Sequence, residues 1–575
     1  MASAREAPRD AAPPADPAAG PAAPVAGAPP PGARAPAPVA AILALGLVLL
    51  GGLLLRLDNI AHGLPFVYHA DEAFHFTSRA VAMFGGDLNP HYFQNPSAFT
   101  YLLHGVLRLT GGGDVAAAYA RDPTGAFLTG RILATVLCLL GAAGVFAVGR
   151  RLWGPAAGVA AAAVLTFAFL PVAYSRLALT DVAVFLPIAL ALYATIRVRE
   201  DGARRWFLLA GAAIGLAVGV KYTAGLLVVP LLVAAWLRAR GGQPGVLREA
   251  AFGLALAAVV FLATTPYFLL DLRVALYQLK VQQQAASLPK HGPAAQHGTD
   301  VFYLRTLTWG LGWGAALAAA AGLVWEWRRD RTRAVLLALF PLLLFVYLST
   351  AGRSFARWLM PAYPVLALFA GVALARLAGA VSRRPAIRAG ALVVLLAAVL
   401  AQPVAIDLHT ARVLGRTDTR QLTREHLLAA LPRGARVVVE PAFPVGYFGG
   451  RLRLGFGPPP KTATFRAGSV TRFIVSLRPQ RIDRYRRAGY CVVVSTSDVR
   501  ERARARRDPR IDAYYRRLAR ESRVEFRASP YRRGAAPVPF DFDLSTHLYE
   551  PSAYERPGPA VTIYRLRDCQ APTRA

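Results

Sequence analysis

The sequence is poor in cysteine and in motifs that hold metals or nucleotides. Three cysteines in 575 residues are too few for a disulfide scaffold. The HExxH and CxxC zinc signatures and the glycine-rich phosphate loops are absent, and the histidines are dispersed. We therefore expect no metal and no cofactor, since paired carboxylates alone give only a weak hint of a divalent cation.

Lysine is also rare. Only four of the 66 basic residues are lysine, so arginine carries most of the positive charge behind the net charge of +33. A strongly basic chain often binds nucleic acid, but here many arginines stand at the ends of apolar runs, where membrane topology requires them. We interpret them mainly as topology signals and expect no nucleic-acid partner.

Hydrophobic residues make up 55% of the chain, and they must be segregated from its many arginines. The sequence does alternate long apolar runs with short arginine-rich stretches, which is typical of a polytopic α-helical membrane protein. Residues 1–38 differ, because alanine and proline dominate them without hydrophobic periodicity. They predict a disordered cytoplasmic tail.

Eleven apolar runs are candidates for membrane spans. They lie near residues 39–55, 126–149, 154–172, 180–196, 206–220, 222–237, 250–266, 303–325, 334–350, 357–379 and 389–404. The first leads into Arg56 without a small-residue cleavage site, so we expect an uncleaved span. The runs at 206–220 and 222–237 are short, and a single bent segment is the alternative interpretation.

The arginines of the short loops predict the orientation. With the N-terminus in the cytoplasm, the arginine-rich stretches that fall inside are 150–151, 197–205, 238–248, 328–333 and 383–388. The opposite loops hold few basic residues. We therefore expect a multi-pass protein of the plasma (inner) membrane, and the odd number of spans places the carboxyl-terminal region outside.

Two regions are expected on the outer side. In the loop 56–125, segments 72–84 and 97–110 carry apolar residues at helical spacing, which predicts helices in the membrane interface.

Residues 405–575 have a mixed, soluble composition, which predicts a small extracytoplasmic α/β domain beyond a transmembrane domain at 39–404. Its expected buried strands are 437–439, 491–494 and 561–564, and its arginine-rich segment 500–523 is typical of helices. Cys491 and Cys569 both lie in this region, and they either form a disulfide or remain isolated thiols. Cys138 lies inside an apolar run.

Charged residues are costly at membrane depth, so those that remain usually line a site. In the predicted orientation they gather at or near the outer ends of the spans: Asp71, Glu72, Arg176, Asp181, Lys221, Arg353 and Arg357. This one-sided distribution predicts a reaction centre that faces the outer leaflet.

The carboxylates also have structural interpretations. Asp71 fits the N-cap of the helix that follows it, with Glu72 favourably placed at the positive helix end and His75 adding polarity nearby. Arg176 and Asp181 fit either an internal ion pair or a site for an anion.

The basic residues also allow both a functional and a structural interpretation. Lys221 is an unusual choice in a chain whose default cation is arginine, which favours a compact phosphate ligand, but a lysine that snorkels from a helix end fits as well. Arg353 and Arg357, which precede Trp358, are similar candidates.

In these motifs the sequence resembles the GT-C glycosyltransferases of the protein O-mannosyltransferase and lipid A aminoarabinose transferase group, also called glycosyltransferase family 39 and its relatives. The matching stretches, in this order, are Arg56 to Pro65 with Asp71-Glu72, Asn95-Pro96 to Tyr101, Tyr174-Ser175-Arg176 to Asp181, Lys221-Tyr222, and Arg357-Trp358-Leu359-Met360-Pro361.

The resemblance implies a GT-C fold and the transfer of a sugar from a polyprenyl-phosphate donor to an acceptor hydroxyl at the outer face. It implies that Asp71 is the general base, with inversion at the anomeric carbon, and that Glu72 assists it or holds the acceptor. The cations placed near the phosphate are Arg176, Lys221, Arg353 and Arg357. The supporting residues are Asp181, His75 and Tyr222. A single carboxylate suffices, because a phosphate held by cations needs no general acid.

The resemblance leaves the acceptor open among protein, lipid and cell-envelope glycan, because the carboxyl-terminal domain matches none of the domains appended to the protein mannosyltransferases. Two other classes of protein compete with a transferase. A transporter or lipid flippase would place charges near the membrane midplane and show related halves, and the sequence shows neither. A membrane scaffold would use the outer charges only for pairing.

Overall fold

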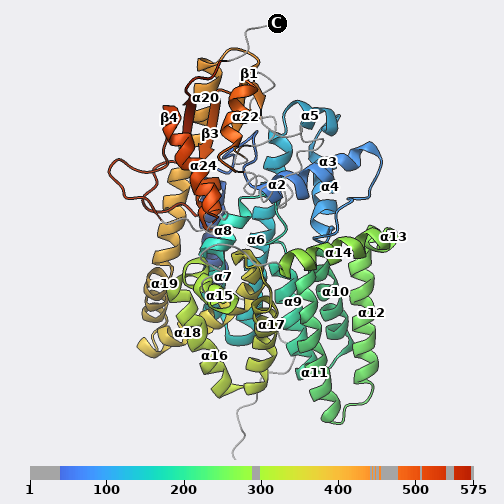
Figure 1. Ribbon diagram of the computed structural model, residues 1–575. Coiled ribbons are helices and arrows are strands. Elements are labelled where there is room, and N and C mark those ends of the chain that lie inside the picture. The colour runs from blue at the N-terminus through green and yellow to red at the C-terminus, as the bar shows by residue number, and fades with distance from the viewer. Residues whose placement is uncertain are drawn as a thin grey trace, which may run out of the picture.

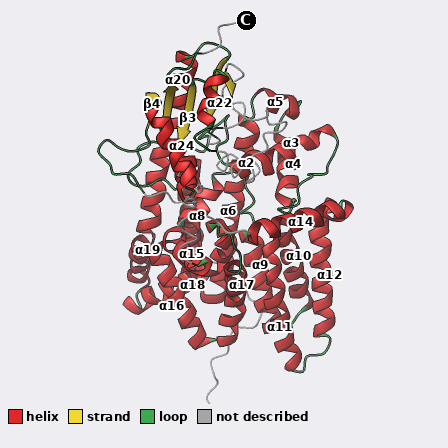
Figure 2. Ribbon diagram, viewed as in Figure 1, coloured by secondary structure: helices red, strands yellow, loops and turns green. Residues whose placement is uncertain are grey.

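The computed structural model describes residues 39–287, 298–440, 443, 447, 452–454, 477–505, 508–538 and 549–570. The predicted tail at 1–38 lies outside these residues. A bundle of long helices occupies one end of the molecule, and a small sheet with its own helices stands at the other end, next to the short helices α2 to α5 (Figures 1 and 2).

Helices occupy all eleven of the predicted apolar runs. They are α1 (Val39–Leu57), α6 (Thr124–Trp153), α7 (Pro155–Phe167) with α8 (Phe169–Ser175), α9 (Phe185–Glu200), α10 (Arg204–Val220), η2 (Tyr222–Leu227) with α11 (Val228–Arg240), α12 (Val246–Thr264), α15 (Thr299–Thr306) with η4 (Leu307–Gly312) and α16 (Trp313–Arg329), α17 (Arg331–Ser349), η5 (Ala356–Ala362) with α18 (Tyr363–Val381), and α19 (Pro385–Leu414). Two further helices, α13 (Pro266–Leu270) and α14 (Leu272–Ser287), follow α12.

Fewer of these helices qualify as membrane spans than the sequence predicts. Among the described residues eight are long and apolar enough to cross a membrane, and a ninth is the pair α7 and α8, bent by 58°. The other two, α9 and α10, have 16 and 17 residues and reach only about 24 and 26 Å, short of the ~30 Å hydrocarbon core. They are short because the chain leaves helical geometry at residues 176–184 and at Lys221.

Small residues let the helices pack closely. α10 packs along α12 with Gly211 and Gly215 at the contact, where an added methyl group would lie 2.0 Å from the carbonyl oxygen of Gly253 and 2.3 Å from that of Ala257. Backbones in this kind of contact approach closely only when side chains are absent. The alanine- and glycine-rich composition of the apolar runs therefore serves the packing between helices.

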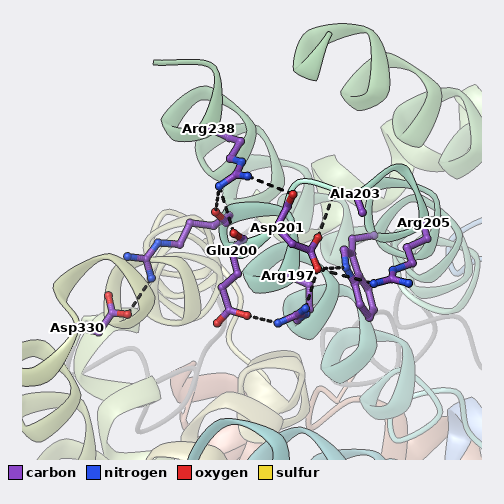
Figure 3. Close-up of polar contacts among 9 residues, drawn as sticks. Arg197, Glu200, Asp201, Ala203, Arg205, Arg238 and Asp330 are labelled. Carbon is purple, nitrogen blue, oxygen red and sulfur yellow. Dashed lines mark hydrogen bonds and ion pairs between the residues drawn. The ribbon is translucent and has the colours of Figure 1, made fainter. Parts of the chain in front are cut away.

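Three of the predicted cytoplasmic loops meet at the end of the bundle that lies away from the sheet (Figure 3). Arg238, at the end of α11, donates hydrogen bonds to the carbonyl oxygens of Glu200 and Asp201, both at 3.2 Å. Arg199 pairs with Asp330, between α16 and α17, at 2.8 Å. These loops therefore share one side of the molecule, as the distribution of arginine predicts.

The loop between α1 and α6 contains the two predicted helical segments. The first is broken at Phe76 into α2 (Ala70–His75) and α3 (Thr77–Ala82), followed by the short turn η1 (Met83–Gly85). The second is α4 (Ala98–Thr110), and α5 (Val115–Arg121) follows it. Buried Phe99 and Leu103 attach α4 to the hydrophobic core of the membrane helices.

The carboxyl-terminal region contains a five-stranded sheet in the order β2-β1-β3-β5-β4. The strands are β1 (Ala435–Val439), β2 (Leu452–Leu454), β3 (Val492–Thr496), β4 (Ser522–Ala528) and β5 (Val561–Leu566). β2, β1 and β3 run parallel, whereas β5 is antiparallel to β3 and to β4.

Within its described residues this region has the helices α20 (Thr419–Ala430), α22 (Arg481–Arg487), α23 (Ser497–Ala505) and α24 (Pro509–Arg520). The predicted α-helical polytopic fold with a small α/β region near the C-terminus is thus confirmed. The helical segment predicted at 500–523 ends slightly earlier, because β4 begins at Ser522. Cys491 and Cys569 form a disulfide, which settles the alternative left open by the sequence.

Candidate functional site

Asp71 lies in the first turn of α2, at the end of the helical bundle that carries the sheet (Figure 1). The N-cap of α2 is His69 rather than Asp71, so the capping interpretation of Asp71 is wrong. A carboxylate one residue inside the helix still interacts favourably with the positive helix end. The Asp71 side chain is 32% exposed, which leaves its carboxylate accessible.

Arg357 is the main partner of Asp71. Its Nη2 atom donates to Asp71 Oδ2, while Nε2 of His75, one turn along α2, lies 3.5 Å from Asp71 Oδ1. Burial by itself raises the pKa of the Asp71 carboxyl, but the charge of Arg357 and the hydrogen bond from His75 outweigh it and hold that pKa well below its ordinary value. Asp71 is therefore ionised.

Lys221 and Asp181 extend the same cluster. Nζ of Lys221 lies 2.6 Å from Asp181 Oδ1 and 3.3 Å from the carbonyl oxygen of Arg357. Lys221 lies at the point where α10 ends, and Asp181 lies in the irregular segment between α8 and α9. Four of the predicted residues thus come together: Asp71, Asp181, Lys221 and Arg357.

Glu72 is not part of this cluster. Its side chain is fully buried, and it accepts hydrogen bonds from Nε and Nη2 of Arg131 at 2.7 and 2.9 Å and from the amide of Ala178 at 2.9 Å. Arg131 also donates to the carbonyl oxygens of Ile60 and His62. Glu72 and Arg131 therefore form a structural ion pair that fixes the start of α2 on α6.

Arg176 faces a different set of residues from Lys221 and Arg357. It is buried and donates to the carbonyl oxygen of Leu55, next to buried Arg56 and in the electrostatic range of Asp407. Asp181 therefore pairs with Lys221, and the predicted alternative of an Arg176–Asp181 ion pair is not formed.

The other predicted residues lie around the cluster or beside it. Arg353 lies between α17 and η5, and among the described residues no ion pair is found for its guanidinium group. His75 stacks on Tyr92 with ring centroids 4.6 Å apart. Tyr222 donates to the carbonyl oxygen of Phe93, which ties η2 to the outer loop rather than to Asp71.

Sequence reasoning missed Arg131 and Tyr174. Arg131 stands inside the apolar run 126–149, so a search for charges at membrane depth would have found it. The guanidinium carbon of Arg357 lies 5.9 Å from the centroid of the Tyr174 ring. Only the fold brings these two residues together. Within the described residues, no three His, Cys, Asp or Glu side chains gather as metal ligands would.

Comparisons with known proteins match both the sequence and the fold. Residues 125–269 match the family described as dolichyl-phosphate-mannose-protein mannosyltransferase. The structure resembles ArnT from Cupriavidus metallidurans bound to undecaprenyl phosphate, with a TM-score of 0.52, 17% identity, and 93% of this chain and 100% of that chain covered.

The apo form of the same ArnT gives a TM-score of 0.50 with 16% identity, and covers 91% of this chain and 98% of that chain. A search of the curated proteins finds no match. A mannosyltransferase-type segment within an ArnT-like fold confirms the resemblance to the GT-C glycosyltransferases of the protein mannosyltransferase and ArnT group.

Proposed function

We propose that the protein is an inverting membrane glycosyltransferase that moves a sugar from a polyprenyl-phosphate donor to an acceptor hydroxyl. The matched family segment and the fold support a membrane glycosyltransferase that uses a lipid-phosphate donor. The observation that carries the proposal is the contact of Asp71 with Arg357, whose backbone also binds Lys221. A base and two cations then lie within one cluster.

Asp71 acts as the general base in this proposal. The acceptor oxygen attacks the anomeric carbon while its proton passes to the Asp71 carboxylate, and the bond from the anomeric carbon to the phosphate oxygen breaks. The configuration of the anomeric carbon is inverted by this single displacement. The bonding electrons leave with the polyprenyl phosphate.

Arg357 and Lys221 stabilise that leaving group. Arg353, whose guanidinium has no ion pair among the described residues, is a further cation for the phosphate or for the lipid headgroup. Because these cations neutralise the phosphate, we propose that the reaction needs neither a general acid nor a metal. We assign Arg176 and Glu72 to the structure that surrounds the site instead of to the reaction.

The pairing of Asp71 with Arg357 supports a reaction in which the donor binds before Asp71 becomes an effective base. In the structure Arg357 holds the carboxylate in its ionised form, which makes Asp71 a weak base. A bound phosphate competes for the same guanidinium group, and its arrival raises the pKa of Asp71 toward the ordinary range. Donor binding thereby activates the base.

We also propose that the loops of Figure 3 face the cytoplasm and that Asp71 and the sheet lie outside. The disulfide between Cys491 and Cys569 supports this orientation, because disulfides persist in oxidising compartments. Labelling of a single cysteine introduced at Arg510, in intact cells with a membrane-impermeant thiol reagent, tests it. If that cysteine is labelled only after the membrane is permeabilised, the orientation is the opposite of the one proposed.

The transferase is tested with purified protein and a panel of radiolabelled hexosyl and pentosyl polyprenyl phosphates. We expect release of the lipid phosphate from one donor, and loss of that release in the Asp71→Asn variant. If folded protein consumes no donor but moves the lipid between leaflets of a vesicle, the chain is a flippase and the proposal is wrong.

A further inference from the structure

The chain just before Asp71 is built into the carboxyl-terminal sheet region. Phe66 and Tyr68 pack against a hydrophobic cluster of that region formed around buried Val437, Val494 and Ile563. Residues 66–68 come from the loop after α1, some 370 positions earlier in the sequence than β1. They therefore complete the core of a region to which they do not belong in sequence.

Arg420, on α20, fixes Tyr68 in this position. Its guanidinium carbon lies 3.5 Å from the centroid of the Tyr68 ring, a close cation–π contact. Asp418 orients Arg420 through two hydrogen bonds of 2.9 and 2.7 Å. The hydroxyl groups of Tyr68 and Tyr447 lie 2.9 Å apart.

The same region is anchored to the membrane helices at a second place. Tyr549 packs on Phe169 of α8 and on Trp309 of η4, with ring centroids 5.5 and 6.1 Å apart. His409 Nε2 lies 3.0 Å from the carbonyl oxygen of Pro551. Loss of the Arg420 contact therefore leaves the sheet region docked, because these contacts do not involve residues 66–68.

We infer that Arg420 is a positioning residue for Asp71: by holding Tyr68 in the core of the sheet region, it fixes the chain on the amino-terminal side of the Asp71 carboxylate, while the Glu72–Arg131 pair fixes the other side. Only His69 and Ala70 separate Tyr68 from Asp71, and the helix starts within that interval. Two intervening residues leave little slack between the anchored ring and the base. This inference rests on the proposed role of Asp71.

The test compares Arg420→Gln, Arg420→Lys and Arg517→Gln in the full-length protein. Arg517 is the matched control, because it pairs with Asp483 and Glu521 inside the sheet region and does not touch residues 66–68. Arg420→Gln should lower kcat by about tenfold or more, since a shift of ~1 Å in a catalytic group can cost up to about 100-fold. The donor KM should change much less than kcat, because Lys221 and Arg357, which hold the phosphate in the proposed mechanism, are unchanged.

Arg420→Lys keeps a cation near Tyr68 but loses the planar stacking and the two-point contact with Asp418, so it should recover only part of the lost kcat. Arg517→Gln should leave kcat near that of the unsubstituted protein. An equal fall of kcat in Arg420→Gln and Arg517→Gln would overturn the inference, because general loosening of the sheet region would then explain both.

Hydrogen exchange separates this inference from the proposed function. Arg420→Gln should speed exchange of the amides in residues 66–76, and Arg517→Gln should not, whether or not any donor is consumed. Unchanged exchange at 66–76 in Arg420→Gln would overturn the inference even in an active transferase. Absence of donor consumption by the unsubstituted protein would overturn the proposed function alone.

Discussion

Replacement of Arg131 by methionine should destabilise the protein more than almost any other single arginine substitution. Arg131 is 4% exposed and Glu72 is fully buried, so the change leaves a carboxylate with only the amide of Ala178 as a partner. Removal of one partner from a buried ion pair costs about 3–5 kcal/mol. The carbonyl oxygens of Ile60 and His62 also lose their donor, which adds about 1–3 kcal/mol.

The free energy of unfolding is measured by equilibrium titration of the detergent-solubilised protein with sodium dodecyl sulfate. Arg204→Met is the control, because Arg204 is 61% exposed and lies 3.5 Å from Glu249, and such a surface pair contributes about 0–1 kcal/mol. The double variant Glu72→Leu with Arg131→Met should recover part of the loss, since neither buried charge of this pair remains. Recovery stays incomplete because the two backbone carbonyls remain without a donor.

A loss of less than ~1 kcal/mol in Arg131→Met, similar to the control, would refute this reasoning. So would a double variant that is as unstable as the single one, since the penalty would then not come from the unpaired Glu72 carboxylate. Either result would reopen a direct role of Glu72 in the reaction.

Four further predictions concern the cluster and the disulfide. Asp71→Asn should lower the rate of lipid-phosphate release about 100-fold or more, with protein yield and thermal stability retained. Because the pKa of Asp71 is depressed in the free enzyme, its carboxylate is protonated only below about pH 4, and kcat/KM should fall only there. With donor bound, kcat should begin to fall at a higher pH. A fall of both parameters at the same pH would contradict activation by the donor. Lys221→Gln should raise the donor KM more than tenfold, measured by initial rates, because a charge-assisted contact to phosphate is lost. Replacement of Cys491 and Cys569 by serine should cost the sheet region about 2–5 kcal/mol, seen as a lower thermal midpoint.

The sequence predicted that these charges gather because charge at membrane depth is costly. Asp71 lies in the loop that follows the first span, Asp181, Lys221 and Arg357 lie at the ends of others, and the structure brings all four together. Arg176 carries the same signal but serves another cluster, since a costly charge is equally satisfied by a backbone carbonyl such as that of Leu55. Composition alone does not tell a charge that belongs to the cluster from one that is satisfied by the backbone.

The adjacent residues Asp71 and Glu72 show most clearly what the sequence could not predict. Asp71 and Glu72 are neighbours with similar side chains, yet one is 32% exposed and the other is fully buried. Successive residues of a helix point in directions about 100° apart, so the pair divides between the accessible cluster and the packed interior. Which of the two faces outward depends on where α6 and Arg131 lie.

The amino-acid sequence by itself determined that this is a helical membrane protein with a one-sided cluster of charges and a mixed α/β end. Local hydrophobic periodicity and charge asymmetry are sufficient for these properties, because each depends on the solvent that a segment must face. Only the tertiary structure decided which charges pair, that α9 and α10 stop short, and that Tyr68 lies under Arg420. Those outcomes depend on contacts between segments far apart in the chain, and no local pattern encodes them.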